Sequence, residues 1–200
     1  VRRGRRTVGD PLQGLRQVAL TTNGVLLTSD RARQLRSAGL DRITISLDAV
    51  EGAVAARMAG LRGGAAAGER LVQQVIEALT VAQAAGFLAE RGELKLNAVI
   101  QRGVNEDQLL PLAELARRHR LELRLIEYMD VGSRNGWGPD QVLPAATMVD
   151  RIRARWPLQP LGRDAGATAR RWRYGDGRGG LGVIASITEP FCGGCNRLRV

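Results

Sequence analysis

The sequence has few of the residues on which several protein classes depend. Its 200 residues include two cysteines, one histidine and 4% aromatic residues, and no long apolar run occurs. Two cysteines are too few for the disulfide framework of a small secreted domain. The missing apolar run argues against a transmembrane helix, and the basic first residues lead into Thr7-Val8-Gly9-Asp10 instead of an apolar signal region. We therefore expect a cytoplasmic protein with no membrane partner.

Positive charge is abundant and almost all of it comes from arginine. The formal net charge of +10 favours an anionic partner such as nucleic acid, a phosphorylated metabolite or acidic lipid. Aromatic stacking platforms are scarce and the arginines form no single basic arm, so we prefer phosphate in a pocket to nucleic acid. Lys95 is the only lysine among 30 basic residues, which suggests that a compact ammonium is needed there. For most individual arginines, charge on a solvated face is the simpler explanation.

The first two thirds of the chain alternate between predicted strands and predicted helices. Four stretches have the composition of strands: residues 16–21, 42–47, 94–100 and 121–127. Helices are expected between them at residues 29–38, 51–59, 69–85 and 105–119, with the glycine-rich residues 60–68 as a loop. Such alternation predicts an α/β fold with a parallel sheet, either doubly wound or part of a β/α barrel.

Polar side chains at the predicted strand ends are the first candidates for a site. Alternation places Lys95 and Asn97 on one face of their strand, and Arg124 on the same face as Glu122. Further polar or polarisable groups follow the other strands: Thr21, Ser46 and Met129. In a parallel sheet these groups would surround one cavity and offer hydroxyls, amides and cations to a phosphorylated ligand. Each one alone is equally well explained by a strand end, a turn or a core position.

Helix caps are also expected from local sequence. Ser29 or Asp30 is predicted to cap the helix at 29–38, and Asn105 to begin the helix that runs to about His119. Beyond Met129 the pattern changes: residues 145–156 predict a helix, and residues 169–174 with 181–187 predict a hairpin. We therefore divide the chain into residues 1–131 and a β-containing extension, residues 132–200.

The two cysteines lie close together, at Cys192 and Cys195, and are followed by the strand-like Arg197-Leu198-Arg199-Val200. Two thiols at this spacing can form half of a zinc site, a thioredoxin-like redox pair, or part of an iron–sulfur cluster site. A redox pair normally precedes a helix, which argues against that interpretation. Zinc needs further ligands, and the only histidine, His119, is expected in the sheet region. The spacing alone leaves these alternatives open, with two inert thiols as the fourth.

Five segments, taken in order, closely resemble the GTP 3',8-cyclase (MoaA) family of molybdenum cofactor biosynthesis, which are radical S-adenosylmethionine enzymes. They are LTTNG at 20–24, AGLDRITISLDA at 38–49, KLNAVIQRGVNEDQ at 95–108, RLIEYMDVG at 124–132 and FCGGCNRLRV at 191–200. The resemblance implies a partial β/α barrel of the radical SAM type, with about four βα units in residues 1–131. The extension, residues 132–200, would then carry part of an auxiliary cluster site.

The resemblance also implies a reaction, cofactors and partners. In the family, a 4Fe-4S cluster on an N-terminal CxxxCxxC motif cleaves S-adenosylmethionine, and the resulting radical starts cyclisation of GTP to 3',8-cyclo-7,8-dihydroguanosine 5'-triphosphate. A second 4Fe-4S cluster holds the guanine end of GTP. Further partners would be an electron donor and, in the pathway, the downstream cyclic pyranopterin monophosphate synthase, and a homodimer is compatible with the family.

Site residues carry over position by position. The resemblance assigns GTP contacts to Thr21, Lys95, Arg124, Arg197, Leu198 and Arg199. It assigns S-adenosylmethionine contacts to Ser46 and Met129, and ligation of the second cluster to Cys192 and Cys195. No separate catalytic residue is assigned.

The sequence departs from the family pattern in ways that bear on activity. It contains no CxxxCxxC motif, no GGEP segment and no third cysteine for the second cluster. We therefore expect a fragment of a longer protein that is inactive by itself. The alternatives are another radical SAM enzyme with an auxiliary iron–sulfur cluster, and a nucleotide- or nucleic-acid-binding module with a zinc half-site.

Overall fold

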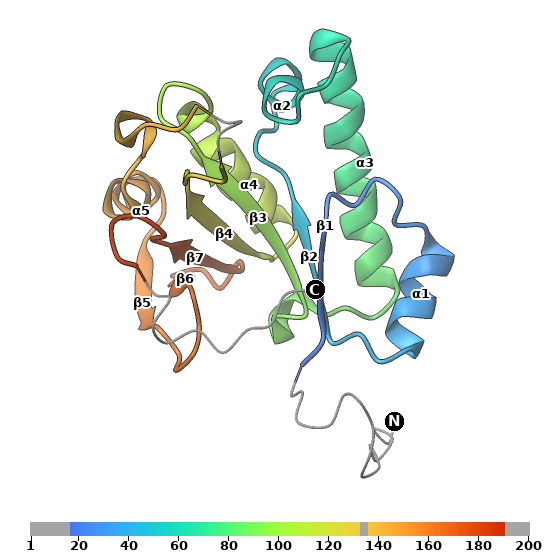
Figure 1. Ribbon diagram of the computed structural model, residues 1–200. Coiled ribbons are helices and arrows are strands. Elements are labelled where there is room, and N and C mark those ends of the chain that lie inside the picture. Colours follow the sequence, from blue (N-terminus) through green and yellow to red (C-terminus); the bar gives the residue numbers. More distant parts are fainter. Residues whose placement is uncertain (1–16, 133–135, 191–200) are drawn as a thin grey trace.

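The computed structural model describes residues 17–132 and 136–190, which form one seven-stranded mixed sheet with helices packed against it (Figure 1). The strand order is β1-β2-β3-β4-β7-β6-β5. Four parallel strands come first in the chain: β1 (Ala19–Thr22), β2 (Arg42–Ser46), β3 (Leu94–Ile100) and β4 (Glu122–Glu127). The extension adds β5 (Leu158–Gly162), β6 (Arg170–Tyr174) and β7 (Gly180–Ile184), of which β7 runs parallel to β4 and antiparallel to β6.

Helices connect the parallel strands and share one side of the sheet. They are α1 (Ser29–Ser37), α2 (Gly52–Met58), α3 (Gly64–Ala84), α4 (Leu109–Arg118) and α5 (Ala145–Arg153), with short 3-10 turns η1 (Ala89–Arg91), η2 (Glu106–Gln108) and η3 (Pro139–Gln141). The order β1 to β4 never reverses, whereas a doubly wound sheet reverses at a switch point. Sequential order is that of a β/α barrel, so the predicted partial barrel is confirmed. No helix in the described ranges combines the length and apolar character needed to cross a bilayer.

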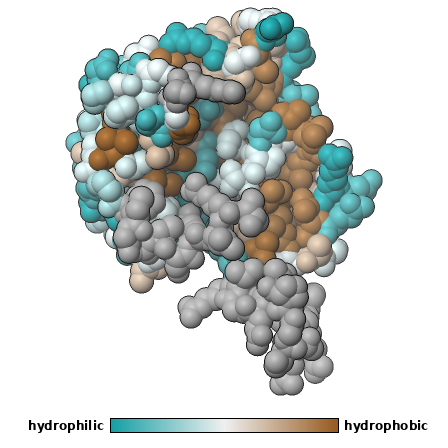
Figure 2. All heavy atoms as spheres, viewed as in Figure 1, coloured by the Kyte–Doolittle hydropathy of each residue, from teal (hydrophilic) through white to brown (hydrophobic). Residues whose placement is uncertain are grey.

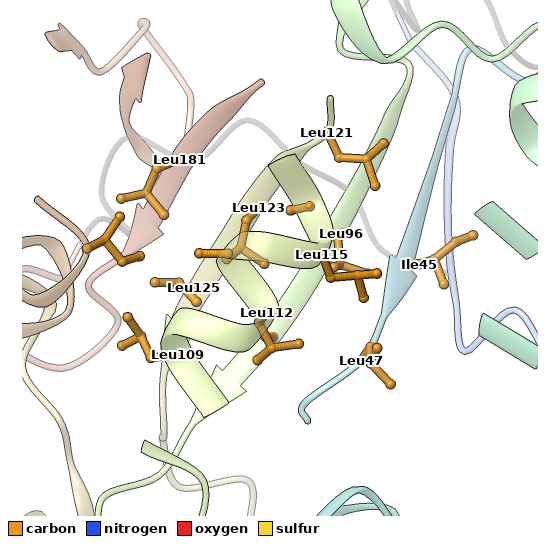
Figure 3. Close-up of a cluster of buried hydrophobic side chains, with 14 of the residues drawn as sticks. Ile45, Leu47, Leu96, Leu109, Leu112, Leu115, Leu121, Leu123, Leu125 and Leu181 are labelled. Carbon is orange, nitrogen blue, oxygen red and sulfur yellow. The ribbon is translucent and has the colours of Figure 1, made fainter. Parts of the chain in front are cut away.

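The helix-covered face of the sheet holds the apolar core. Leucines of α4 point toward leucines of β3, β4 and β7 (Figure 3). The labelled core residues with no exposed surface include Leu96, Leu112, Leu121, Leu123, Leu125 and Leu181. Leu123 and Leu125 occupy alternate positions along β4, so the side chains beside and between them point to the other face. Burial of these leucine side chains, each worth roughly 2 kcal/mol, fixes the register of the sheet.

Helix α3 differs from its prediction, because it begins at Gly64 and not at Glu69. The glycines and alanines of residues 60–68 predicted a loop, yet most of them are helical and pack against α2. A Cβ atom on Gly68 would lie 1.7 Å from the carbonyl oxygen of Gly52, so only glycine permits this contact. Close packing between the helices therefore offsets the low helix propensity of the glycines in this segment.

Two cap predictions were wrong. Thr28 caps α1, with its hydroxyl accepting a hydrogen bond from the Arg31 amide at 3.3 Å, so neither Ser29 nor Asp30 is the cap. Asn105 does not cap α4 either. Its Nδ2 donates to the carbonyl oxygens of Asp48 and Val99 at 2.7 and 2.8 Å, and this ties the ends of β2 and β3 together.

In the extension, the predicted hairpin is confirmed as β6 and β7, and the predicted helix as α5, which ends at Arg153. Strand β5 was not predicted, because Pro160 interrupts the strand pattern of residues 158–162. The proline is tolerated because β5 is an edge strand with a register shift between Pro160 and Gly162.

Candidate ligand-binding site

Polar side chains gather on the face of the sheet opposite the helices, which we call the polar face. Residues opposite each other on neighbouring strands point to the same side. One cross-strand row consists of Thr21, Thr44, Lys95 and Glu122. The next row consists of Ser46, Asn97, Arg124, Gly182 and Arg171. The registers therefore bring the predicted residues Thr21, Lys95, Ser46 and Arg124 to one face.

Glu122 joins three cations of the polar face into one group, the Glu122 cluster (Lys95, Glu122, Arg124 and Arg171). Its Oε1 accepts hydrogen bonds from Lys95 Nζ and from Arg124 Nε, each at 2.8 Å. Its Oε2 accepts from Arg171 Nε at 3.0 Å. The side chains of Lys95, Glu122 and Arg124 are only 7 to 9% exposed, so each charge depends on its partners. One carboxylate serves three cations, which leaves the cluster positive.

Burial and charge shift the protonation of this cluster. Burial, helped by the positive charge of Arg124, lowers the pKa of Lys95 to about 8 against the opposing pull of Glu122. Burial alone would raise the pKa of Glu122, but Lys95 and Arg124 outweigh it and hold that pKa at about 2. Near neutral pH the carboxyl of Glu122 is therefore ionised and the amine of Lys95 is mostly protonated.

A cavity of about 570 Å³ lies at the carboxyl ends of β1 and β2. Ser46 and Asp48 line it from β2, and Arg62 and Arg70 line it from the region of α2 and α3. Burial raises the pKa of Asp48, and this is partly opposed by the hydrogen bond from the Val99 amide to Oδ1 at 2.8 Å. A cavity of this size can enclose a nucleoside-sized ligand.

Thr21 and Met129 are the more exposed of the predicted contacts. Thr21 lies on β1, and Met129 follows β4 with 41% of its surface exposed. Figure 2 shows hydrophobic side chains gathered over the region of β1 and α3. Carboxyl ends of parallel strands meet at one edge of a sheet, so Ser46 and Met129 belong to the same edge, with β3 between their strands.

The predicted residues Cys192, Cys195, Arg197, Leu198 and Arg199 lie outside the described residues. Within residues 17–132 and 136–190, no three carboxylate or imidazole groups converge in a way that could hold a metal ion. Ligation of the second cluster by the two cysteines therefore stays a prediction.

Glu127 is a buried acid that the sequence did not single out. It has no exposed surface and ends β4. Its Oε1 accepts from the Ala145 amide at 2.7 Å and from Thr188 Oγ1 at 2.6 Å, and its Oε2 accepts from the Ile187 and Thr188 amides. These bonds fix the start of α5 and the segment after β7 against the end of β4. The signal in the sequence is that Glu127 alternates with Leu123 and Leu125, so a charged residue occupies a position expected to face the core.

Two family models match the chain. The model of the radical SAM superfamily matches residues 3–116, and the model described as Molybdenum Cofactor Synthesis C matches residues 121–200.

Curated relatives are similar along the whole chain. A protein named GTP 3',8-cyclase from Synechococcus sp. (strain CC9605) is 71% identical over all 200 residues, which cover 58% of that protein. A protein of the same name from Xanthomonas axonopodis pv. citri (strain 306) is 48% identical over 94% of this chain and 53% of its own length. The chain thus spans little more than half of these relatives. One solved structure, titled "Native anSMEcpe with bound AdoMet and Cp18Cys peptide", covers 70% of this chain and 37% of its own, with 13% identity and a TM-score of 0.42.

Proposed function

We propose that this chain, which belongs to the radical SAM superfamily, forms part of a GTP 3',8-cyclase that acts in molybdenum cofactor biosynthesis. The observation that carries this proposal is the likeness to GTP 3',8-cyclases along the entire chain. The substrate would be GTP, and the product would be 3',8-cyclo-7,8-dihydroguanosine 5'-triphosphate. The chain supplies part of the barrel, residues 1–131, and part of the extension, residues 132–200.

The Glu122 cluster supports a site for the phosphates of GTP. Lys95 and Arg124 are cations on the polar face, and ammonium and guanidinium groups are the usual protein partners of phosphate. Glu122 holds both in place, so little side-chain entropy is lost when an anion binds. Thr21 shares the row of Lys95 and can offer a hydroxyl. Arg197, Leu198 and Arg199 would add contacts from the end of the chain.

The cavity at Ser46 supports a site for S-adenosylmethionine. Its volume suits a nucleoside, and Ser46 offers a hydroxyl that can donate or accept. We assign Ser46 and Met129 as contacts. When bound beside a first 4Fe-4S cluster, S-adenosylmethionine supplies the adenosyl radical. That cluster would be held by a CxxxCxxC motif, which this sequence does not contain.

The remaining assignments concern the second cluster and the cellular context. Cys192 and Cys195 would ligate a second 4Fe-4S cluster together with a further ligand, leaving one iron for the guanine end of GTP. The protein would need an electron donor, would pass its product toward cyclic pyranopterin monophosphate synthase, and would work in the cytoplasm. A homodimer is compatible with these roles.

The test is an anaerobic assay of a protein that joins this chain to a CxxxCxxC motif and the missing cluster ligand. With GTP, S-adenosylmethionine and a reductant, we expect 5'-deoxyadenosine and the cyclised nucleotide in equal amounts. Production of 5'-deoxyadenosine without cyclised nucleotide would point to another radical SAM reaction. Absence of both products from protein that contains its clusters would reject the proposal.

A further inference from the structure

Arg171 is a cation of the polar face that neither the sequence motifs nor the family resemblance singles out. It lies on β6, in the same cross-strand row as Arg124. Its Nε donates to Glu122 Oε2 at 3.0 Å and its Nη1 donates to Asp164 Oδ2 at 3.1 Å. The extension of the chain thus contributes a charge to a cluster that is otherwise built by the parallel strands.

Gly182 makes this arrangement possible. It lies on β7, between Arg124 on β4 and Arg171 on β6. A Cβ atom at Gly182 would lie 3.3 Å from Arg124 Cγ and 3.5 Å from Glu122 Oε1, so a larger side chain would fill the space where these groups meet. Glycine inside a strand is unfavourable and commonly marks a close approach of another group. The strand therefore leaves room for the guanidinium groups above it.

The charges around Glu122 do not balance. Three cations donate to one buried carboxylate. Asp164 is 72% exposed, so its ion pair with Arg171 is screened by water and compensates little. An anion bound on this face would complete the balance, and a polyphosphate carries enough charge to engage several cations at once.

Arg171 is better placed to reach a ligand than to act only as a link between strands. Its side chain is 35% exposed, whereas that of Glu122 is 9% exposed. Arg124 donates to Glu122 from Nε, so its two terminal nitrogens are not committed to that carboxylate. The carboxylate thus anchors the guanidinium groups of two arginines on one face without enclosing that of Arg171.

We propose that Arg171 is the third cation of the phosphate site and that, together with Lys95 and Arg124, it recognises the polyphosphate chain of a nucleoside triphosphate. This inference rests on the proposed function for its ligand class and adds a residue to the same site. Binding of inorganic triphosphate requires no radical chemistry, and it therefore tests Arg171 separately from catalysis.

The experiment is calorimetric titration of the full chain with inorganic phosphate, diphosphate and triphosphate at low salt. Arg171→Gln is compared with Arg118→Gln, which removes the same charge from an exposed residue of α4, on the helix-covered side of the sheet. We expect Arg171→Gln to weaken triphosphate binding about tenfold or more, and phosphate binding less. Arg118→Gln should stay within about twofold of the unmodified chain.

A second variant keeps the test decisive if Arg171→Gln does not fold. Asp164→Asn changes an exposed residue and removes the negative charge that competes for Arg171. We expect it to strengthen triphosphate binding by about two- to fivefold. Unchanged affinity in a folded Arg171→Gln would leave Arg171 a structural link and overturn the proposal. Where that variant does not fold, unchanged affinity in Asp164→Asn would overturn it, as would failure of the unmodified chain to bind triphosphate.

The two proposals fail in different ways. Weakened triphosphate binding in Arg171→Gln, with no cyclised nucleotide from the longer protein, would keep the phosphate site and reject the cyclase. Cyclisation with unchanged triphosphate affinity in Arg171→Gln would keep the cyclase and reject the role of Arg171.

Discussion

Where β3 begins to pair with β4, both faces of the sheet are buried, but they are stabilised by different interactions. On β3, Leu96 has no exposed surface, while its neighbour Lys95 on the polar face is 6% exposed. On β4, Leu123 is also fully buried, and Glu122 beside it is 8% exposed. One face excludes water by packing leucines, and the other keeps charges in place by pairing them.

The two kinds of interaction contribute differently to the stability of the fold. A leucine core gains free energy from every buried methylene and requires no specific partner. A buried ion pair gains little, because the loss of hydration offsets the attraction, so such groups are seldom retained for stability alone. The Glu122 cluster therefore has little net effect on the free energy of folding, and its surplus of positive charge is the basis of the anion site that we propose on the polar face.

The largest effect is expected from Glu122→Gln on the polar face. The variant leaves Lys95 and Arg124 without their shared carboxylate, which should reduce the free energy of unfolding by about 4 kcal/mol near pH 7. The measurement is the urea midpoint with its slope.

The pH dependence of that loss identifies its cause. The pKa of Glu122 is about 2 in the folded chain and 4.5 in the reference state, so the unfolded chain binds the extra proton between these values. The ionised carboxyl of Glu122 stabilises the folded chain fully above pH 4.5, and this stabilisation is lost as the pH falls toward 2. The difference between Glu122→Gln and the unmodified chain should therefore shrink near pH 3. An equal loss at both pH values would mean that the side-chain charge is irrelevant.

A slightly smaller effect is expected on the helix-covered face. Leu96→Ala removes a fully buried side chain and should cost about 3 kcal/mol, through lost burial and the cavity that remains. No titratable group is involved, so the loss should be the same near pH 7 and near pH 3. Leu96→Met, which preserves volume, is the control and should cost less than about 1.5 kcal/mol. A strongly pH-dependent loss in Leu96→Ala would show that the two faces are coupled.

Features of the fold that depend on local sequence were predicted, whereas features that depend on long-range contacts were not. Residues 94–100 formed the predicted strand because their composition and alternation agree. The start of α3 was missed because it depends on contact between Gly52 and Gly68, which local propensity does not contain. Strand β5 was missed because Pro160 is acceptable only at an edge, and edge position is a property of the whole sheet.

The residues of the candidate site were likewise predictable only where local sequence was sufficient. The family resemblance and strand alternation indicated Lys95 and Arg124, and the structure places both on one face. Alternation also placed Glu122 beside Arg124, but its role as shared partner depends on pairing of β3 with β4. Arg171 lies far from Glu122 in the sequence. The two side chains meet because β7 pairs with both β4 and β6, and because the β7 residue between Arg124 and Arg171 is Gly182. Such convergence is not visible in a single sequence.

A moderate effect is expected from pH on anion binding. The pKa of Lys95 is lowered from 10.5 to about 8, so the folded chain loses this proton before the unfolded chain does. Stability should then rise between pH 8 and 10.5, because the unfolded state binds more protons there, whereas triphosphate affinity should fall as the ammonium is neutralised.

Lys95→Arg is the matched variant for this measurement, because a guanidinium stays protonated throughout. Titrations near pH 7 and near pH 9 should show the unmodified chain losing up to about tenfold more triphosphate affinity than Lys95→Arg. Titration of the ligand itself affects both proteins equally and cancels. Parallel pH profiles would show that Lys95 is not a partner of the anion.

The smallest effect is expected at Asn97, also on the polar face. Its side-chain Oδ1 is buried and has no hydrogen-bond partner within the described ranges, so Asn97→Ala removes no bond to that atom. We expect the free energy of unfolding to change by less than about 0.5 kcal/mol. The control is Ala98→Asn, which places the same amide on the helix-covered face, where Ala98 is 1% exposed, and should cost about 2 kcal/mol or more. Urea midpoints for the two variants compare the faces at adjacent residues, and a large loss in Asn97→Ala would show that the polar face is also organised for stability.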